Sequence, residues 1–318
     1  MRLPAASLAL LGGCCCLMDS TPLVGQKYSI AWGPLTVPAG TDATQCVVLQ
    51  LSNADEIYVH QLHVTGAHHM IVYRDDVDQT ESATPSDCTP FSGALDPSGM
   101  VAPLMVTSHH DDELTLPDGV AYRFAPHQMI RIELHYINSG DSPTQESATA
   151  EFYAVDKSTI HDEAGVMLIG TPDVALPPNA IATVDQAFVP SQADPDLVDA
   201  SVFAAAGFTH QYGTAVEVSG MGQRAPIYAP QSFEWNAPSV TTIDPPLAVA
   251  ADQSFDVACS YYNSTAGAIG FGSSPADEVC FFWAYYFPAT TARVCVHDAA
   301  AGDVCCPGGA PLCAQILQ

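Results

Sequence analysis

Proline and glycine interrupt this chain so often that long helices are not expected. Among 318 residues there are 25 Pro and 22 Gly, and a proline inside a helix removes a hydrogen bond and clashes with the preceding turn. Between the interruptions lie short alternating or β-branched runs, at 46–51, 70–74, 129–136, 149–155, 214–218, 255–261 and 279–286. Short strands separated by turn residues are typical of antiparallel sandwiches and barrels. The sequence therefore predicts an all-β protein.

Charge excludes whole classes of partner. Eight Lys and Arg stand against 35 Asp and Glu, which gives a formal net charge of -27. Nucleic acids and anionic lipid surfaces are bound through basic patches, so we expect no nucleic-acid partner and no docking on anionic membranes. With 48 % hydrophobic residues, the chain can bury a core large enough for two domains of ordinary size.

The first twenty residues have the features of an export signal. Arg2 is followed by an apolar run at 3–11 and then by Gly12, Gly13 and Cys14, which is the order of a secretory signal peptide. The same segment resembles a bacterial lipobox, in which Cys14 would be lipidated. An ordinary cleaved signal is the alternative. No later run reaches the roughly 18 apolar residues of a membrane span, so we expect a periplasmic, cell-surface or secreted protein with at most a lipid anchor.

We divide the rest of the chain into 21–163, 164–292 and a Cys-rich tail at 293–318. The stretch 164–179 contains three prolines and is the expected junction. Eight cysteines remain after the signal, an even number without a CxxC pair, and in an exported chain this indicates disulfides rather than a zinc site. Four of them lie in the tail, which is expected to be irregular; the chemistry of the residues alone leaves the pairing open. These eight are Cys46, Cys88, Cys259, Cys280, Cys295, Cys305, Cys306 and Cys313.

Histidines carry the candidate chemistry. In the run 129–136, alternation places the isoleucines and Leu134 toward the core and His135 on the opposite face. Upstream, His68 and His69 stand directly before the strand 70–74. Three imidazoles around one ion suit copper or zinc, whereas paired surface histidines without a ligand role are the alternative.

Several further polar groups invite two interpretations. His60 and His63 are candidates for contacts that orient metal ligands, or for packing. The run 109–112, His-His-Asp-Asp, is either a second metal patch or a solvated loop, and we favour the loop. Arg131 and Glu133 are expected to form a surface ion pair.

Five segments occur in an order that points to one family. They are Gly66–Met70 (GAHHM), Ile132–Tyr136 (IELHY), Phe208–Gly213 (FTHQYG), Cys259–Asn263 (CSYYN) and Glu278–Cys280 (EVC). Together with their spacing, from about residue 36 to 288, they resemble the copper type II, ascorbate-dependent monooxygenases, among them peptidylglycine α-hydroxylating monooxygenase and dopamine β-monooxygenase.

This resemblance implies two jelly-roll-like antiparallel β-sandwich domains, each donating ligands to one copper. It implies that His68, His69 and His135 hold the copper that supplies an electron, with ascorbate or another electron donor as reductant. It also implies a disulfide between Cys259 and Cys280.

The second copper, which binds and activates oxygen in the family, has lost most of its ligands in this sequence. The family pattern of two histidines and a methionine is replaced by Phe208, His210 and Val279. A phenyl ring and an isopropyl group donate no lone pair, so we expect this site to be empty and His210 to be a remnant of it.

The positions that would surround a substrate depart from the family as well. The arginine that grips a peptide carboxylate is replaced by Ala206, and Phe281–Trp283 are expected to make an apolar pocket. The acidic net charge also repels anions. A small-molecule substrate or donor should therefore be neutral or cationic.

Three functions compete on this basis. We favour an exported copper-dependent oxidoreductase that works with the three-His site. The alternative is a copper-binding or electron-transfer protein of the cell envelope that does not hydroxylate. A purely structural, disulfide-linked β-sandwich is the third, and the retention of His68, His69 and His135 counts against it.

Overall fold

The computed structural model describes residues 25–66, 69–88, 101–107, 109–272, 274, 276–289 and 292–307. Strands dominate this part of the chain, so the prediction of an all-β protein is confirmed. Within it, helical turns are limited to η1 (Lys157–Thr159), α1 (Pro190–Ala193) and η2 (Pro195–Leu197), and no helix is long and apolar enough to cross a membrane. The predicted signal at 1–20 with Cys14, and also His68 and Cys313, lie outside the described residues.

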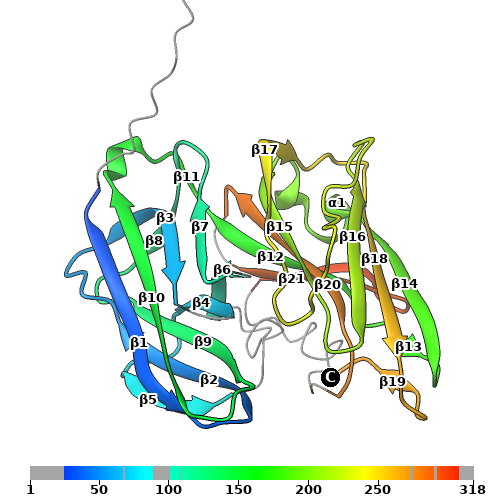
Figure 1. The fold of residues 1–318 in the computed structure, drawn as a ribbon. Coiled ribbons are helices and arrows are strands. Elements are labelled where there is room, and N and C mark those ends of the chain that lie inside the picture. Colours follow the sequence, from blue (N-terminus) through cyan, green and yellow to red (C-terminus); the bar gives the residue numbers. More distant parts are fainter. Residues whose placement is uncertain are drawn as a thin grey trace, which may run out of the picture.

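Strands β1 to β11 make a first unit of two sheets, which occupies the left half of Figure 1. One sheet contains, in order, β1 (Lys27–Val37), β10 (Thr144–Val155), β3 (Ile57–Thr65), β8 (Val120–Phe124) and β11 (Asp162–Glu163), with β7 (Asp111–Thr115) also paired to β3. The other contains β5 (Ser82–Asp87), β2 (Thr41–Gln50), β9 (Met129–Asn138), β4 (His69–Asp75) and β6 (Val101–Val106).

Strands β12 to β22 make a second unit beside the first (Figure 1). Its large sheet contains β17 (Thr241–Ala248), β15 (Ser201–Phe208), β20 (Cys280–Phe287), β12 (Gly165–Thr171), β21 (Arg293–Asp298) and β22 (Gly302–Pro307). Behind it lie β14 (Ala180–Phe188), β18 (Phe255–Asn263) and β16 (Gly213–Gly220), and the short pair β13 (Ala175–Leu176) and β19 (Ile269–Gly270). Among the strands of the described residues, β8–β11 and β12–β21 are the parallel pairs.

The beginning of the Cys-rich tail is regular where the sequence indicated an irregular segment. β21 pairs with the central strand β12, and β22 returns along it as an antiparallel hairpin. Val294 and Val296 are buried toward the first unit's core, and Cys295 is buried on the opposite side. This alternation makes residues 293–307 part of the large sheet.

Three disulfides join described cysteines, and they are consistent with an extracellular or secreted protein. The pairs are Cys46–Cys88, Cys259–Cys280 and Cys295–Cys305. Cys306 is disulfide-bonded as well. The middle pair is the one that the family resemblance implied.

One hydrophobic core extends across both units. It fills the first sandwich and continues through one face of the large sheet of the second unit, where Trp283 and Tyr285 of β20 belong to it. A second core fills the space behind that sheet. Consequently the sheet of β9 is covered on both faces, by its own sandwich and by the second unit.

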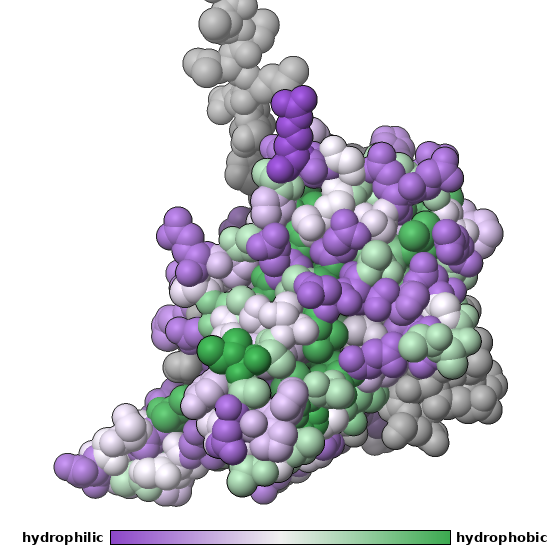
Figure 2. Space-filling model, turned by 90° about the vertical axis from the view of Figure 1, so that its right-hand side faces the viewer, coloured by the Kyte–Doolittle hydropathy of each residue, from purple (hydrophilic) through white to green (hydrophobic). Residues whose placement is uncertain are grey.

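The side of the second unit that faces away from the first mixes hydrophilic and hydrophobic residues (Figure 2). Ile181 on β14 and Tyr262 on β18 are direct partners in the sheet, and they are 82 % and 54 % exposed. The opposite side of this unit packs against the first unit, with which it shares one core.

Candidate metal centre

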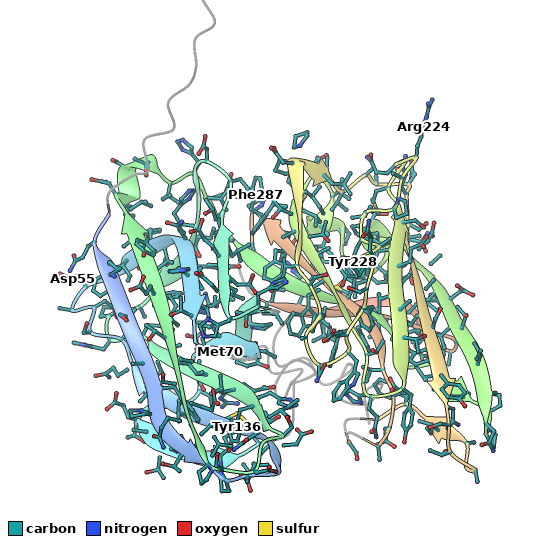
Figure 3. The ribbon with its side chains drawn as sticks, in the orientation of Figure 1. Asp55, Met70, Tyr136, Arg224, Tyr228 and Phe287 are labelled. Atoms are coloured by element: carbon teal, nitrogen blue, oxygen red, sulfur yellow. A yellow bond between two sulfur atoms is a disulfide. The ribbon has the colours of Figure 1, made fainter. Side chains whose placement is uncertain are left out.

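The first unit brings His69 and His135 directly opposite each other. β4 begins at His69 and runs antiparallel to β9, in which His135 is the partner of His69. Opposite residues of such a pair share a face, with Cβ atoms about 4.5–5.5 Å apart. Met70 and Tyr136, the next residues along the two strands, are labelled in Figure 3. The structure describes His69 by its backbone alone, and His68, which precedes it, lies outside the described residues.

His135 is held inside the sheet by its neighbours on a third strand. It is 6 % exposed, and its Nε2 lies 2.9 Å from Oδ1 of Asp42. Asp42 belongs to β2, which flanks β9 on the side opposite β4. The imidazole therefore stands on the middle one of three paired strands, between a histidine and a carboxylate.

The start of β4 is anchored by Thr107, a fully buried residue that follows β6. The Met70 amide donates to Thr107 Oγ1 (2.8 Å), and the Thr107 amide donates to the Met70 carbonyl (2.9 Å). Two reciprocal hydrogen bonds hold the backbone beside His69, so the position of this histidine does not depend on a loop alone.

The prediction of a surface ion pair between Arg131 and Glu133 is wrong. Glu133 is 1 % exposed and accepts a hydrogen bond from the Tyr73 hydroxyl at 2.9 Å. Burial and the neighbouring carboxylate raise the pKa of Tyr73 well above its ordinary value, so this phenol stays protonated and donates. Arg131 pairs with Asp75 and Asp78, at 3.0 and 3.3 Å. The face of β9 that carries Glu133 and His135 is therefore buried.

The donor set of this first site fits copper. His69 and His135 lie on adjacent, hydrogen-bonded strands, and imidazole is a common copper ligand. Among the side chains that the structure describes, no three His, Cys, Asp or Glu gather closely enough to hold a metal ion. The side chains of His68 and His69 are not among the described side chains. The fit of this site to copper therefore rests on the register of β4 and β9.

In the second unit, one buried carboxylate binds the backbone of residues at the positions that the family resemblance assigns to the second copper. Glu278 is fully buried and accepts backbone hydrogen bonds from His210 (2.9 Å), Tyr212 (2.7 Å) and Val279 (3.2 Å). The Phe208 and His210 rings meet edge to face with centroids 5.7 Å apart. Phe208, His210 and Val279 thus converge at the end of β15.

Two ionisable groups of this second site have shifted pKa values. Burial raises the pKa of Glu278 to about 7, against the opposing effect of its backbone hydrogen bonds. Burial also lowers the pKa of His210, whose Nδ1 lies 3.0 Å from the Asp277 carbonyl oxygen. The imidazole is therefore neutral at pH 7 and already engaged with the backbone.

The residues of the second site do not fit copper. Phe208 is 1 % exposed and Val279 is fully buried, and both belong to the core that joins the units. Neither side chain has a lone pair to donate. His210 is the only one of the three positions with a metal-binding group, and a single imidazole does not make a copper site.

The expectation of one apolar pocket lined by Phe281–Trp283 is also wrong. Phe281 and Trp283 lie in the core that joins the units, whereas Phe282 points into the core of the second sandwich. Neighbouring strand residues face opposite sides of a sheet, so the three rings cannot line one pocket. Ala206, at the position of the family's arginine, is fully buried.

The other histidines have partners away from this centre. His63, on β3, lies 2.7 Å from Asp111, which raises its pKa, and the His60 ring lies 3.0 Å from the Val120 carbonyl oxygen. Both belong to the sheet that does not contain β9. His109 is exposed and lies 3.3 Å from Asp112, but the run 109–112 is not all loop, because Asp111 and Asp112 begin strand β7.

Sequence reasoning missed three polar residues at these sites. Asp42 and Tyr73 are far from β9 in the sequence, and they reach His135 and Glu133, respectively, only through strand pairing. Glu278 belongs to the EVC segment, but nothing in the sequence marks it as the acceptor for three backbone amides. The one sequence feature that could have indicated its role is that Glu278, a charged residue, stands directly before the apolar strand β20.

Comparison with known proteins supports the copper type II ascorbate-dependent monooxygenase family. Residues 162–303 match the C-terminal domain of the copper type II ascorbate-dependent monooxygenases. Tyramine beta-hydroxylase of Caenorhabditis briggsae is 25 % identical over 203 residues, which cover 59 % of this chain and 33 % of that protein. The match thus spans about a third of the relative's length.

Solved structures give weaker likenesses. N-glycanase F is 7 % identical with a TM-score of 0.33, covering 85 % of this chain and 97 % of the other. An empty particle of cowpea mosaic virus is 7 % identical with a TM-score of 0.26, covering 87 % and 92 %.

Proposed function

We propose that this chain, a member of the copper type II ascorbate-dependent monooxygenase family, is an exported copper-dependent oxidoreductase with one working copper site. His68, His69 and His135 hold that copper. The second position, at Phe208, His210 and Val279, holds none. The observation that carries the proposal is the register of β4 and β9, which sets His69 directly opposite His135.

Copper bound at these imidazoles supplies one-electron chemistry between its two oxidation states. The chain's own residues provide a rigid frame for it. Met70 and Thr107 fix the backbone beside His69 through two hydrogen bonds, and the pairing of β9 with β2 and β4 fixes His135. Such a frame would keep the ligands in place in both oxidation states of the copper.

A second candidate is a copper-binding or electron-transfer protein without hydroxylase activity. It is favoured by the burial of Phe208 and Val279 in the core between the units. Where the family places its oxygen-activating copper, this chain has close-packed side chains. A protein built this way passes electrons from ascorbate or another donor to an acceptor and leaves oxygen unreacted.

The charge of the chain indicates which small molecules the site would take. With a net charge of -27, long-range repulsion disfavours anions. A neutral or cationic substrate or donor fits this field, and the curated relative is named for tyramine, an amine. Export fits the disulfides, and lipidation at Cys14 remains part of the proposal.

The experiment is oxygen consumption by the copper-loaded full chain in the presence of ascorbate. The oxidoreductase proposal expects uptake with at least one amine substrate, and loss of it in His135→Ala. If copper is reduced by ascorbate but no oxygen is consumed with any of a broad substrate panel, the electron-transfer function stands instead. If wild-type protein binds no copper, both are wrong.

A further inference from the structure

We infer that His63 is a positioning residue, which fastens strand β7 and, through it, the backbone on both sides of the candidate ligands His68 and His69. The inference rests on the proposed copper function. Among the described strands, β7 pairs with β3 alone. Its first residue, Asp111, lies opposite Thr65, the last residue of β3. The chain continues from Thr65 to the two ligands within four residues, so a contact that holds Asp111 acts close to the copper site.

The segment 107–111 holds the backbone before and after these ligands. The His110 carbonyl accepts a hydrogen bond from the Gly66 amide at 2.9 Å, directly after β3. At the start of β4, Thr107 exchanges two hydrogen bonds with Met70, at 2.8 and 2.9 Å. Both ends of the stretch that carries the ligands therefore depend on one short segment, and β7 begins at the end of that segment.

The His63 ring fastens the beginning of β7 to the rest of the sheet. Its Nε2 lies 2.7 Å from Oδ1 of Asp111 on β7. Its Nδ1 lies 3.5 Å from Oε2 of Glu151 on β10, the strand on the other side of β3. An ionised carboxylate only accepts hydrogen bonds, and only the protonated imidazole carries a hydrogen on each nitrogen. The two carboxylates therefore fit a positively charged ring that bridges three neighbouring strands.

The groups that face His63 are mostly acidic. They are Glu151 and Tyr153 on β10, Asp111 and Glu113 on β7, and Lys27 on β1, which pairs with Glu151. Hydrogen bonds from Lys27 and Tyr153 lower the pKa of Glu151 to about 2, so this carboxylate stays ionised. The hydrogen bond with Asp111 raises the pKa of His63 above its ordinary value. The contact is therefore complete below about pH 6.5 and is lost as the pH rises through the raised pKa.

A metal-binding role for His63 itself does not fit this arrangement. Both ring nitrogens face carboxylates, and among the described side chains no three His, Cys, Asp or Glu gather closely enough to hold a metal ion. The side chains of His63 and Asp111 are 28 % and 73 % exposed, and exposed ion pairs change an equilibrium by about fivefold at most. We therefore expect a modest effect on copper affinity with a distinctive dependence on pH.

The first experiment tests the contact in the metal-free full chain. Nuclear magnetic resonance follows the titration of the His63 ring and the hydrogen exchange of the Gly66 amide. The pKa of His63 should lie above its ordinary value in wild type and fall in Asp111→Asn. Protection of the Gly66 amide should be greater at pH 6 than at pH 8.5 in wild type, and His63→Gln should remove most of that difference. A pKa of His63 that Asp111→Asn leaves unchanged overturns the inference.

Copper titration at the same two pH values gives the functional readout. His63→Gln should bind copper about 2- to 5-fold more weakly than wild type at pH 6 and equally well at pH 8.5. His63→Arg keeps its charge at both values and should match wild type at pH 6 and exceed it at pH 8.5. The matched control is His297→Gln, because His297 also lies 2.7 Å from a carboxylate, that of Asp303, but belongs to the second unit. This control should leave copper affinity unchanged.

The outcomes separate the inference from the proposed function. An affinity ratio between wild type and His63→Gln that is the same at both pH values, or a lack of rescue by His63→Arg, overturns the positioning role. If wild type binds no copper while His63 titrates with a raised pKa and controls the Gly66 amide, the proposed copper function is wrong and the contact that fastens β7 stands.

Discussion

β9 in the first unit and β18 in the second end in the same way, yet β9 carries the candidate ligand His135 where β18 carries Ser260. Asn138 ends β9 and donates through Nδ2 to the carbonyls of Val37, Pro38 and Ser142. Asn263 ends β18 and donates to Leu176, Pro177 and Gly267. Each asparagine oxygen also accepts the amide two residues on.

Three residues before each asparagine the two strands differ. β9 has His135 and β18 has Ser260, although a buried tyrosine follows both. The strand ends depend on buried amides that have nothing to do with copper. In the second unit, Phe208 and Val279 are apolar side chains that belong to the core between the units.

Restoring the missing donors should produce the largest change. Phe208→His combined with Val279→Met returns the family's ligand set around His210. Glu278 already holds the backbone of His210 and Val279, so we expect the double variant to bind a second copper. Elemental analysis of the purified full chain, with and without the change, measures the gain.

The matched control is the same pair of changes in a His210→Ala background, which should return to the wild-type copper content. A double variant that folds, by circular dichroism, and gains no copper would show that the second site has lost its geometry as well as its ligands.

Substituting Asn138 and Asn263 tests whether the ends of β9 and β18 contribute equally to stability. Asn138→Ala and Asn263→Ala each remove three hydrogen bonds to backbone carbonyls, and a buried group left unsatisfied costs about 1–3 kcal/mol. We expect each change to lower the free energy of unfolding by about 3–4 kcal/mol. Urea denaturation measures this, and Asn263→Ala should leave copper binding unchanged. If only one of the two variants has a lower free energy of unfolding, the two strand ends are not equivalent.

A smaller expected effect is a dependence of the free energy of unfolding on pH, which comes from Glu278 in the second unit. The pKa of Glu278 is about 7 in the folded chain against an ordinary value of 4.5, so the folded state holds a proton between these values that the unfolded state has released. Stability from this group is full below pH 4.5, falls as the pH rises to 7 and is constant above. The fall is at most about 3 kcal/mol.

Glu278→Gln isolates this contribution. The difference in unfolding free energy between wild type and variant should change across pH 4.5–7 and stay level from pH 7 to 8. Other groups, such as His63, titrate equally in both proteins and cancel. A difference independent of pH would mean that the carboxylate is already ionised throughout.

The sequence predicted the strand class and the alternation of β9 because proline, glycine and period-two patterns are local. It did not predict that Glu133 is buried, since alternation shows that two faces differ and not what covers each one. The cover over Glu133 comes from Tyr285 and its neighbours, about 150 residues away. The hairpin at 293–307 was missed for the same reason, because β21 is stabilised by pairing with the distant β12.

The central claim is that one of the two units binds copper and the other does not. Copper content of the metal-loaded full chain, measured together with His135→Ala and His210→Ala, tests it directly. The account predicts one copper per chain in wild type and in His210→Ala, and none in His135→Ala. Two coppers in wild type, or a copper that disappears with His210, would contradict it.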